Sequence, residues 1–94
     1  MSTMTPVIEK QTNTVTKLGK LWKCLVHNDD VNSMDHVTHA LMEVFKFNPT
    51  EAVEIMLEAH ESGVALCKIE TKELAELHQQ QLQALSLTAT IEPE

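Results

Sequence analysis

Apolar and polar residues alternate with two different spacings along this chain, and the shorter spacing predicts strands. Leu21 to His27 is a short, mostly apolar run that ends at the polar triplet Asn28-Asp29-Asp30. Because Asn and Asp favour turns, we expect a strand over 21–27 and a turn after it. Similar short runs predict a second strand over Val64 to Ile69 and a third over Ser86 to Ile91.

The segment after the polar triplet has helical spacing. Ser33 is a suitable N-cap, because its hydroxyl can accept a hydrogen bond from a backbone N–H of the first turn. Apolar residues then recur at intervals of three and four, which places them on one face of a helix. These residues are Met34, Val37, Leu41, Val44 and Phe45.

A second helix has clear signals at both of its ends. Asn48 is the expected N-cap, Pro49 the first helical residue and Glu51 the partner in a capping box. Gly63 is expected to end the helix in the left-handed conformation. The expected apolar stripe consists of Ala52, Val53, Met56 and Leu57, with His60 on the same line.

A third helix is predicted from Thr71, its N-cap, to about Leu85. We expect Leu74, Leu82 and Leu85 to face inward and the run of Gln79, Gln80 and Gln81 to be mostly solvated. The element order is therefore β-α-α-β-α-β. This order predicts a small α+β domain with a three-stranded sheet covered on one face by three helices.

The domain is expected to span residues 21–94, preceded by a flexible N-terminal tail over residues 1–20. In this tail Thr recurs and apolar residues are isolated, so it cannot bury enough surface to offset its ordering entropy. A chain of 94 residues supports one modest core. We expect a monomer.

Composition excludes several classes of function. The net charge is −7 and there is no Arg, which argues against nucleic acid as a partner. No apolar run reaches the ~20 residues of a membrane span, and the N-terminus lacks a secretory signal, so a cytoplasmic location is expected. Cys24 and Cys67 are expected to be buried free thiols of a reducing compartment; a disulfide or ligand pair is the less favoured alternative.

The acidic turn is the first candidate for chemistry. Asn28, Asp29 and Asp30 can bind a cation, but the Glu that closes a calcium-binding EF-hand loop is absent. A turn and capping role is the alternative. His60 is the second candidate, either as a hydrogen-bonded core histidine or as a polar group at the edge of an apolar pocket.

The chain lacks the common motifs of catalytic and metal sites. It contains no HExxH, CxxC, glycine-rich phosphate loop or nucleophile elbow. His36 and His39 lie three residues apart on one helix, a spacing that often arises by chance. We therefore expect no enzyme activity, no metal and no cofactor.

Several of these segments together resemble the ClpS adaptor family. The motifs are Val26-His27-Asn28-Asp29-Asp30 followed by Met34, Met56-Leu57-Glu58-Ala59-His60 followed by Gly63, Ala65-Leu66-Cys67, and Thr71-x-Glu73-x-Ala75-Glu76. The resemblance covers about residues 22–92. It implies a non-enzymatic adaptor of the bacterial or plastid N-degron pathway, which delivers proteins with a first Leu, Phe, Tyr or Trp to a Clp AAA+ unfoldase (ClpA or ClpC) for degradation by ClpP.

The resemblance also implies roles for individual residues. It assigns the substrate α-amino group to Asn28, Asp29 and His60. It assigns the wall of the side-chain pocket to Met34, Val37, Met56, Ala59 and Leu87. It assigns contacts with the N-domain of the unfoldase to Glu73, Glu76 and His78.

Two questions stay open at this level. An interaction domain with a fold like that of the ribosomal stalk protein, without N-degron binding, is the alternative function. The preferred first residue of the substrate is also open, because Asn32-Ser33 stands where the family commonly has Thr-Pro, and Ala59 where Val is frequent. At the unfoldase-facing position, His78 stands where a Lys is often found.

Overall fold

The predicted fold class is confirmed by the computed structural model, which describes residues 19–94. The predicted tail over residues 1–20 lies outside the described residues, apart from Gly19 and Lys20. Six elements follow one another: β1 (Leu21–His27), α2 (Met34–Phe45), α3 (Pro49–Ser62), β2 (Val64–Thr71), α4 (Lys72–Ala84) and β3 (Thr88–Pro93). Within residues 19–94, no helix is long and apolar enough to cross a membrane.

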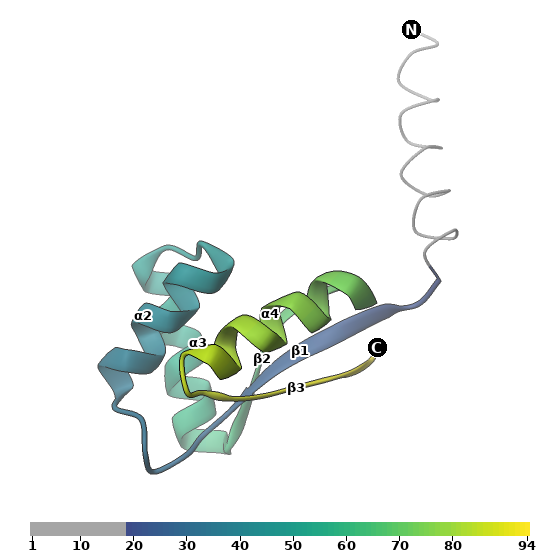
Figure 1. Cartoon of the computed structure of the whole chain (residues 1–94). Helices are drawn as coiled ribbons and strands as arrows, with labels where there is room; N and C mark the ends of the chain where they lie inside the picture. The colour runs from purple at the N-terminus through teal and green to yellow at the C-terminus, as the bar shows by residue number, and fades with distance from the viewer. Residues whose placement is uncertain (1–18) are drawn as a thin grey trace, which may run out of the picture.

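The three strands form an antiparallel sheet in the order β2-β1-β3. The central strand β1 sends Cys24 and Val26 to the buried face, and Val26 pairs with Ala65 of β2 and Ala89 of β3. Figure 1 shows α4 lying along the sheet and α2 at the end far from the C-terminus. The helix α2 packs against α3 and α4, and the core lies between the helices and the sheet.

A β-bulge interrupts the pairing of β1 with β2. The register shifts between Cys24 and Leu25, so Cys67 has no partner of its own on β1. Both cysteines are free and buried, as predicted. Burial raises the pKa of the Cys24 thiol to about 12 and also raises that of Cys67, so both thiols stay protonated and unreactive near neutral pH.

The ends of the first two helices agree with the sequence signals. The Ser33 hydroxyl accepts a hydrogen bond from the backbone N–H of His36. Asn48 and Glu51 form the predicted capping box, and Gly63 ends α3 with φ 89°. These local interactions satisfy backbone groups that no intrahelical bond can reach.

The third strand begins two residues later than predicted, at Thr88. Ser86 and Leu87 instead form a Schellman motif, in which their backbone N–H groups bond the carbonyls of Gln83 and Leu82. Ser86 takes the left-handed conformation, with φ 71°. The end of α4 therefore uses residues whose composition had suggested a strand, while β2 extends two residues beyond its prediction, to Thr71.

Two of the predicted helix faces are partly wrong. Leu74 was expected to face inward but is 45% exposed, and Ala75 is buried in its place. On α3, Val53 and Leu57 lie at the surface, whereas the buried residues are Ala52, Met56 and Ala59. Ala residues therefore take much of the buried faces of α3 and α4, beside Met56 and Leu82, and Val53, Leu57 and Leu74 lie at the surface.

Candidate ligand-binding site

A cavity of about 290 Å³ lies where the loop after β1 meets α2 and α3. The loop contributes polar side chains to the rim, and the two helices contribute apolar side chains to the wall. The lining residues are His27, Asn28, Asp29, Asp30, Asn32, Ser33, Met34, Val37, Met56, Ala59 and His60. Such a combination of an apolar wall and a few convergent polar groups is typical of a ligand site.

The fold brings together seven of the eight residues expected to contact the substrate, although they come from segments about thirty residues apart. Asn28 and Asp29 follow β1, Met34 and Val37 belong to the first turns of α2, and the remaining three belong to the last half of α3. Leu87 is the exception: it does not line the cavity and is buried in the core.

The loop is attached to the protein on one side through the end of α3. The backbone N–H of Asn28 donates to the carbonyl oxygen of Gly63 at 3.0 Å. This bond fixes the start of the loop beside the last turn of α3, which carries His60. His60 is exposed, so the interpretation of this residue as part of the hydrophobic core is wrong.

On its other side the loop is attached through the carboxylate of Asp29. Oδ1 of Asp29 accepts from the backbone N–H groups of Val31 and Asn32, at 3.0 and 2.9 Å. The amide of Asn32 donates to both carboxylate oxygens, and the Thr88 hydroxyl donates to Oδ2. These hydrogen bonds, chiefly that from the Asn32 backbone, lower the pKa of Asp29 below its usual value, so the carboxylate is fully charged at neutral pH.

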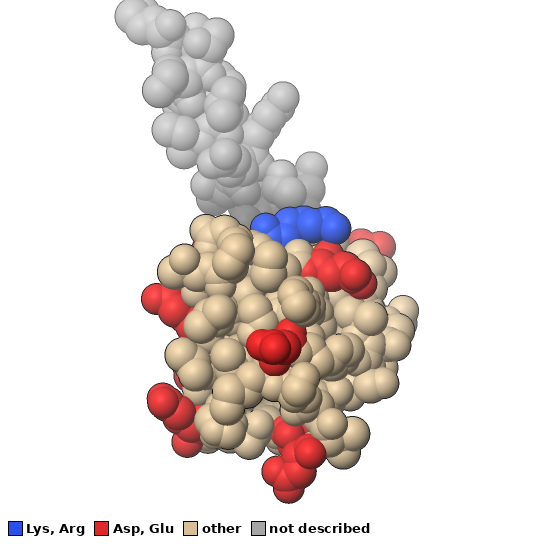
Figure 2. Space-filling model, turned by 90° about the vertical axis from the view of Figure 1, so that its left-hand side faces the viewer, with Lys and Arg blue, Asp and Glu red and all other residues tan. Residues whose placement is uncertain are grey.

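The surface around the cavity favours a cation. Figure 2 views the molecule from the end that carries α2 and shows acidic side chains at several places on this face. The net charge of −7 makes the long-range field of the whole protein attractive to positive groups. Within residues 19–94, no group of three or more His, Cys, Asp or Glu side chains is arranged to hold a metal ion.

Asn32 and Ser33 were not among the residues expected to bind a ligand, yet both line the cavity. The signal that could have indicated Asn32 is local: the side chain of an Asp in a turn commonly accepts hydrogen bonds from backbone N–H groups two or three residues later. The additional bond of Asn32 to the carbonyl oxygen of Ser86 spans 54 positions and has no such signal.

A family model for the ATP-dependent Clp protease adaptor protein ClpS matches residues 17–90. The chain belongs to the ClpS family. The resemblance inferred from the Asn-Asp-Asp and Met-Leu-x-x-His motifs is thereby confirmed, and the family is one of protease adaptors, not of catalytic subunits.

Individual relatives agree over most of the chain. A ClpS adapter protein of Prochlorococcus marinus is 39% identical over 87 residues, which cover 92% of this chain and 83% of the relative. That of Gloeobacter violaceus is 43% identical over 75 residues, covering 79% and 81% of the two chains. The solved structure of Agrobacterium tumefaciens ClpS2 bound to L-phenylalaninamide matches with a TM-score of 0.78 and 30% identity, over 80% of this chain and 98% of that one.

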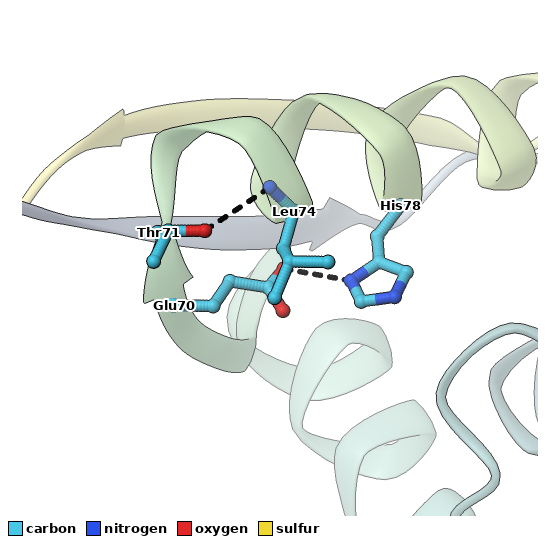
Figure 3. Close-up of polar contacts among 4 residues, drawn as sticks. All are labelled: Glu70, Thr71, Leu74 and His78. Carbon is cyan, nitrogen blue, oxygen red and sulfur yellow. Dashed lines mark hydrogen bonds and ion pairs between the residues drawn. The ribbon is translucent and has the colours of Figure 1, made fainter. Parts of the chain in front are cut away.

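The residues expected to contact the unfoldase all lie on α4, and none of them lines the cavity. Glu73 and Glu76 are exposed on this helix and border a shallow surface depression. His78 differs from them because its ring lies under the helix and faces the buried carboxylate of Glu70 (Figure 3). Only the two glutamates therefore present their side chains freely to a partner.

Proposed function

We propose that this ClpS protein captures proteins that begin with a bulky hydrophobic residue and delivers them to a Clp AAA+ unfoldase, ClpA or ClpC, for degradation by ClpP. The observation that carries the proposal is the junction of polar and apolar groups in one cavity. A chain that begins with Leu, Phe, Tyr or Trp presents the complementary pair: an ammonium group and, two bonds away, a large side chain.

The polar rim suits an α-ammonium group, which has donors but no acceptor. The amide oxygen of Asn28 and a neutral ring nitrogen of His60 can each accept a hydrogen bond, and both side chains are exposed at the cavity. Oδ1 of Asp29 already receives three donors and Oδ2 two, so this carboxylate would meet the ligand through Oδ2, the less occupied oxygen. Each charge-assisted hydrogen bond contributes about 1.5–3 kcal/mol.

The apolar wall suits the side chain of the first residue. Met34, Val37, Met56 and Ala59 surround the hollow, whose volume of about 290 Å³ exceeds the ~150 Å³ that suffices for a benzene ring. Burying a Leu or Phe side chain there contributes about 1.5–3 kcal/mol. Agrobacterium tumefaciens ClpS2 was solved with L-phenylalaninamide, a molecule with a free α-amino group and a Phe side chain, which supports the same ligand class here.

A separate surface is proposed for the unfoldase. Glu73 and Glu76 are exposed on α4, and Leu74 and Leu77, each next to one of them in the chain, are both 45% exposed. Exposed leucines flanked by carboxylates are typical of a partner-binding surface with an apolar centre and a charged rim. Because α4 does not contribute to the cavity, the adaptor could hold its substrate and its unfoldase at the same time.

A titration with two fluorescent peptides tests the proposed ligand. One peptide begins with a free Leu, and its twin is identical except for an acetylated N-terminus, which removes the positive charge. We expect the free peptide to bind with micromolar affinity and the acetylated peptide at least tenfold more weakly, since one lost charge-assisted bond corresponds to about that factor. Equal affinities would disprove recognition of the free N-terminus.

A further inference from the structure

Asn32 has an unusual number of bonds for a loop residue. Its Nδ2 atom lies 3.0 Å from each carboxylate oxygen of Asp29 and 2.8 Å from the carbonyl oxygen of Ser86. A side-chain amide has two N–H groups. One of them can be shared between the two oxygens of Asp29, while the other bonds the backbone of Ser86.

The two ends of this connection differ in rigidity. Ser86 belongs to the Schellman motif that ends α4, where its own N–H is bonded to Gln83 and that of Leu87 to Leu82. Asp29 belongs to the loop at the cavity, and apart from Asn32 its only bond to a distant element is that from Thr88, at 3.3 Å. Two side chains therefore connect the Asp29 carboxylate to distant elements. The connection through Asn32 ends in the shorter bond, at 2.8 Å to Ser86, against 3.3 Å for the bond from Thr88.

We propose, on the basis of the function proposed above, that Asn32 is the positioning residue of the ammonium site: it holds the Asp29 carboxylate at the cavity rim by bridging it to the carbonyl of Ser86. A binding group is effective only when its own orientation is fixed by surrounding contacts. Without the bridge, the carboxylate keeps its charge but swings with the loop, and affinity for the ammonium group falls.

The chemistry of an amide explains what Asn adds at this position in this chain. Thr at position 32 can donate its single hydroxyl hydrogen to Asp29 or to Ser86, but not to both. Asp at this position has no donor and places a second negative charge against Asp29. The bridge therefore predicts a graded series of variants, in which Thr is intermediate and Asp is the most damaging.

The test compares Asn32→Ala and Asn32→Thr with Asn48→Ala. Asn48 is the N-cap of α3, so its replacement destabilises the protein by loss of a cap without touching the cavity. Affinity is measured for three peptides that begin with free Leu, free Ala and acetylated Leu. NMR titration of the wild type and the variants gives the pKa of the Asp29 carboxyl group.

Asn32→Ala is expected to weaken binding of the free-Leu peptide about tenfold, to leave the Leu-to-Ala affinity ratio unchanged and to raise the Asp29 pKa. Asn32→Thr should have a smaller effect, and Asn48→Ala none on either quantity. Binding by Asn32→Ala within twofold of wild type, or an unchanged Asp29 pKa, would overturn the proposal. If wild type itself does not distinguish free from acetylated Leu, the proposed function fails instead, and the Asp29 pKa still decides whether Asn32 holds the carboxylate.

Discussion

The Nδ1 atom of His78 lies 2.8 Å from Oε2 of Glu70, a glutamate whose side chain is only 3% exposed. The ring of His78 also packs against that of Phe45, with centroids 4.6 Å apart. The other carboxylate oxygen of Glu70 is buried without a hydrogen-bond partner. Glu70 therefore depends on His78 for its one strong polar contact among the described residues.

Removal of the His78 side chain should consequently destabilise the folded protein. We expect His78→Ala to lower the free energy of unfolding by about 2–3 kcal/mol, because it leaves a buried carboxylate without a partner. Gln80→Ala, an exposed change on the same helix, should alter stability by less than about 0.5 kcal/mol. Urea unfolding measures the free energy of unfolding of both variants. A loss in His78→Ala as small as that of the control would show that Glu70 does not need the hydrogen bond from His78.

Met34 is predicted to select against β-branched first residues. It lies at the start of α2, is 44% exposed and lines the cavity, so packing of the core does not account for it. Val and Ile branch at Cβ, next to the ammonium site, whereas Leu and Phe branch one carbon deeper. Met34→Ala should admit first Val and Ile while retaining Leu.

The measurement uses four peptides that differ only in a first Leu, Phe, Val or Ile. Met42→Ala is the matched control, because Met42 lies on the same helix and packs against the core instead. The ratio of Ile to Leu affinity should rise in Met34→Ala and stay constant in Met42→Ala. Met34 is not the selecting residue if the two variants give the same ratio.

The Asp29 carboxylate should make stability dependent on pH in the acidic range. Its hydrogen bonds lower its pKa in the folded protein, so folding favours the charged form. The stabilisation is complete above the unfolded pKa of about 3.9 and is lost as pH falls through the lower folded value. Asp29→Asn should therefore be less stable than wild type at pH 7, with a difference that shrinks below about pH 4.

Thermal unfolding of both proteins from pH 7 to pH 2.5 measures this difference. Glu54→Gln, an exposed change on α3, gives the effect of charge removal alone. A difference between Asp29→Asn and wild type that is independent of pH would contradict a role for the charged carboxylate in the loop.

The left-handed conformation of Ser86 offers a route to a more stable protein. For a residue with a Cβ, this conformation is unfavourable by about 1 kcal/mol or more, whereas for glycine it is not. Ser86→Gly should raise the free energy of unfolding by about 1 kcal/mol, and Ser86→Ala should not. The bond from Asn32 uses the backbone oxygen of Ser86, so peptide affinity should be retained in both variants.

Reversal of charge on α4 should separate delivery from capture. The double variant Glu73→Lys/Glu76→Lys is expected to slow degradation of an N-degron substrate by the matching unfoldase–protease pair severalfold, with peptide affinity unchanged. The control Glu43→Lys/Glu54→Lys makes the same charge change at exposed positions on α2 and α3. Equal degradation rates for the two double variants would place the unfoldase contact elsewhere.

The sequence by itself determined the elements of this protein and most of their ends. Asn48, Pro49, Glu51 and Gly63 act on backbone groups within one turn of themselves, so their effect can be predicted without knowledge of the rest of the chain. The first strand, from Leu21 to His27, was predicted with its observed bounds for a similar reason, because the polar triplet ends it locally. The fold class followed from the order of these elements.

Tertiary structure decided which faces are buried and how the rim of the cavity is built. Whether Leu74, Val53 and Leu57 face outward depends on how the helices pack against the sheet and against one another, which no single segment specifies. The bonds of Asn32 to Ser86 and of Asp29 to Thr88 join positions 54 and 59 apart. Contacts of this kind form only after the chain has folded, because the loop, the end of α4 and the start of β3 meet only when β3 pairs with β1.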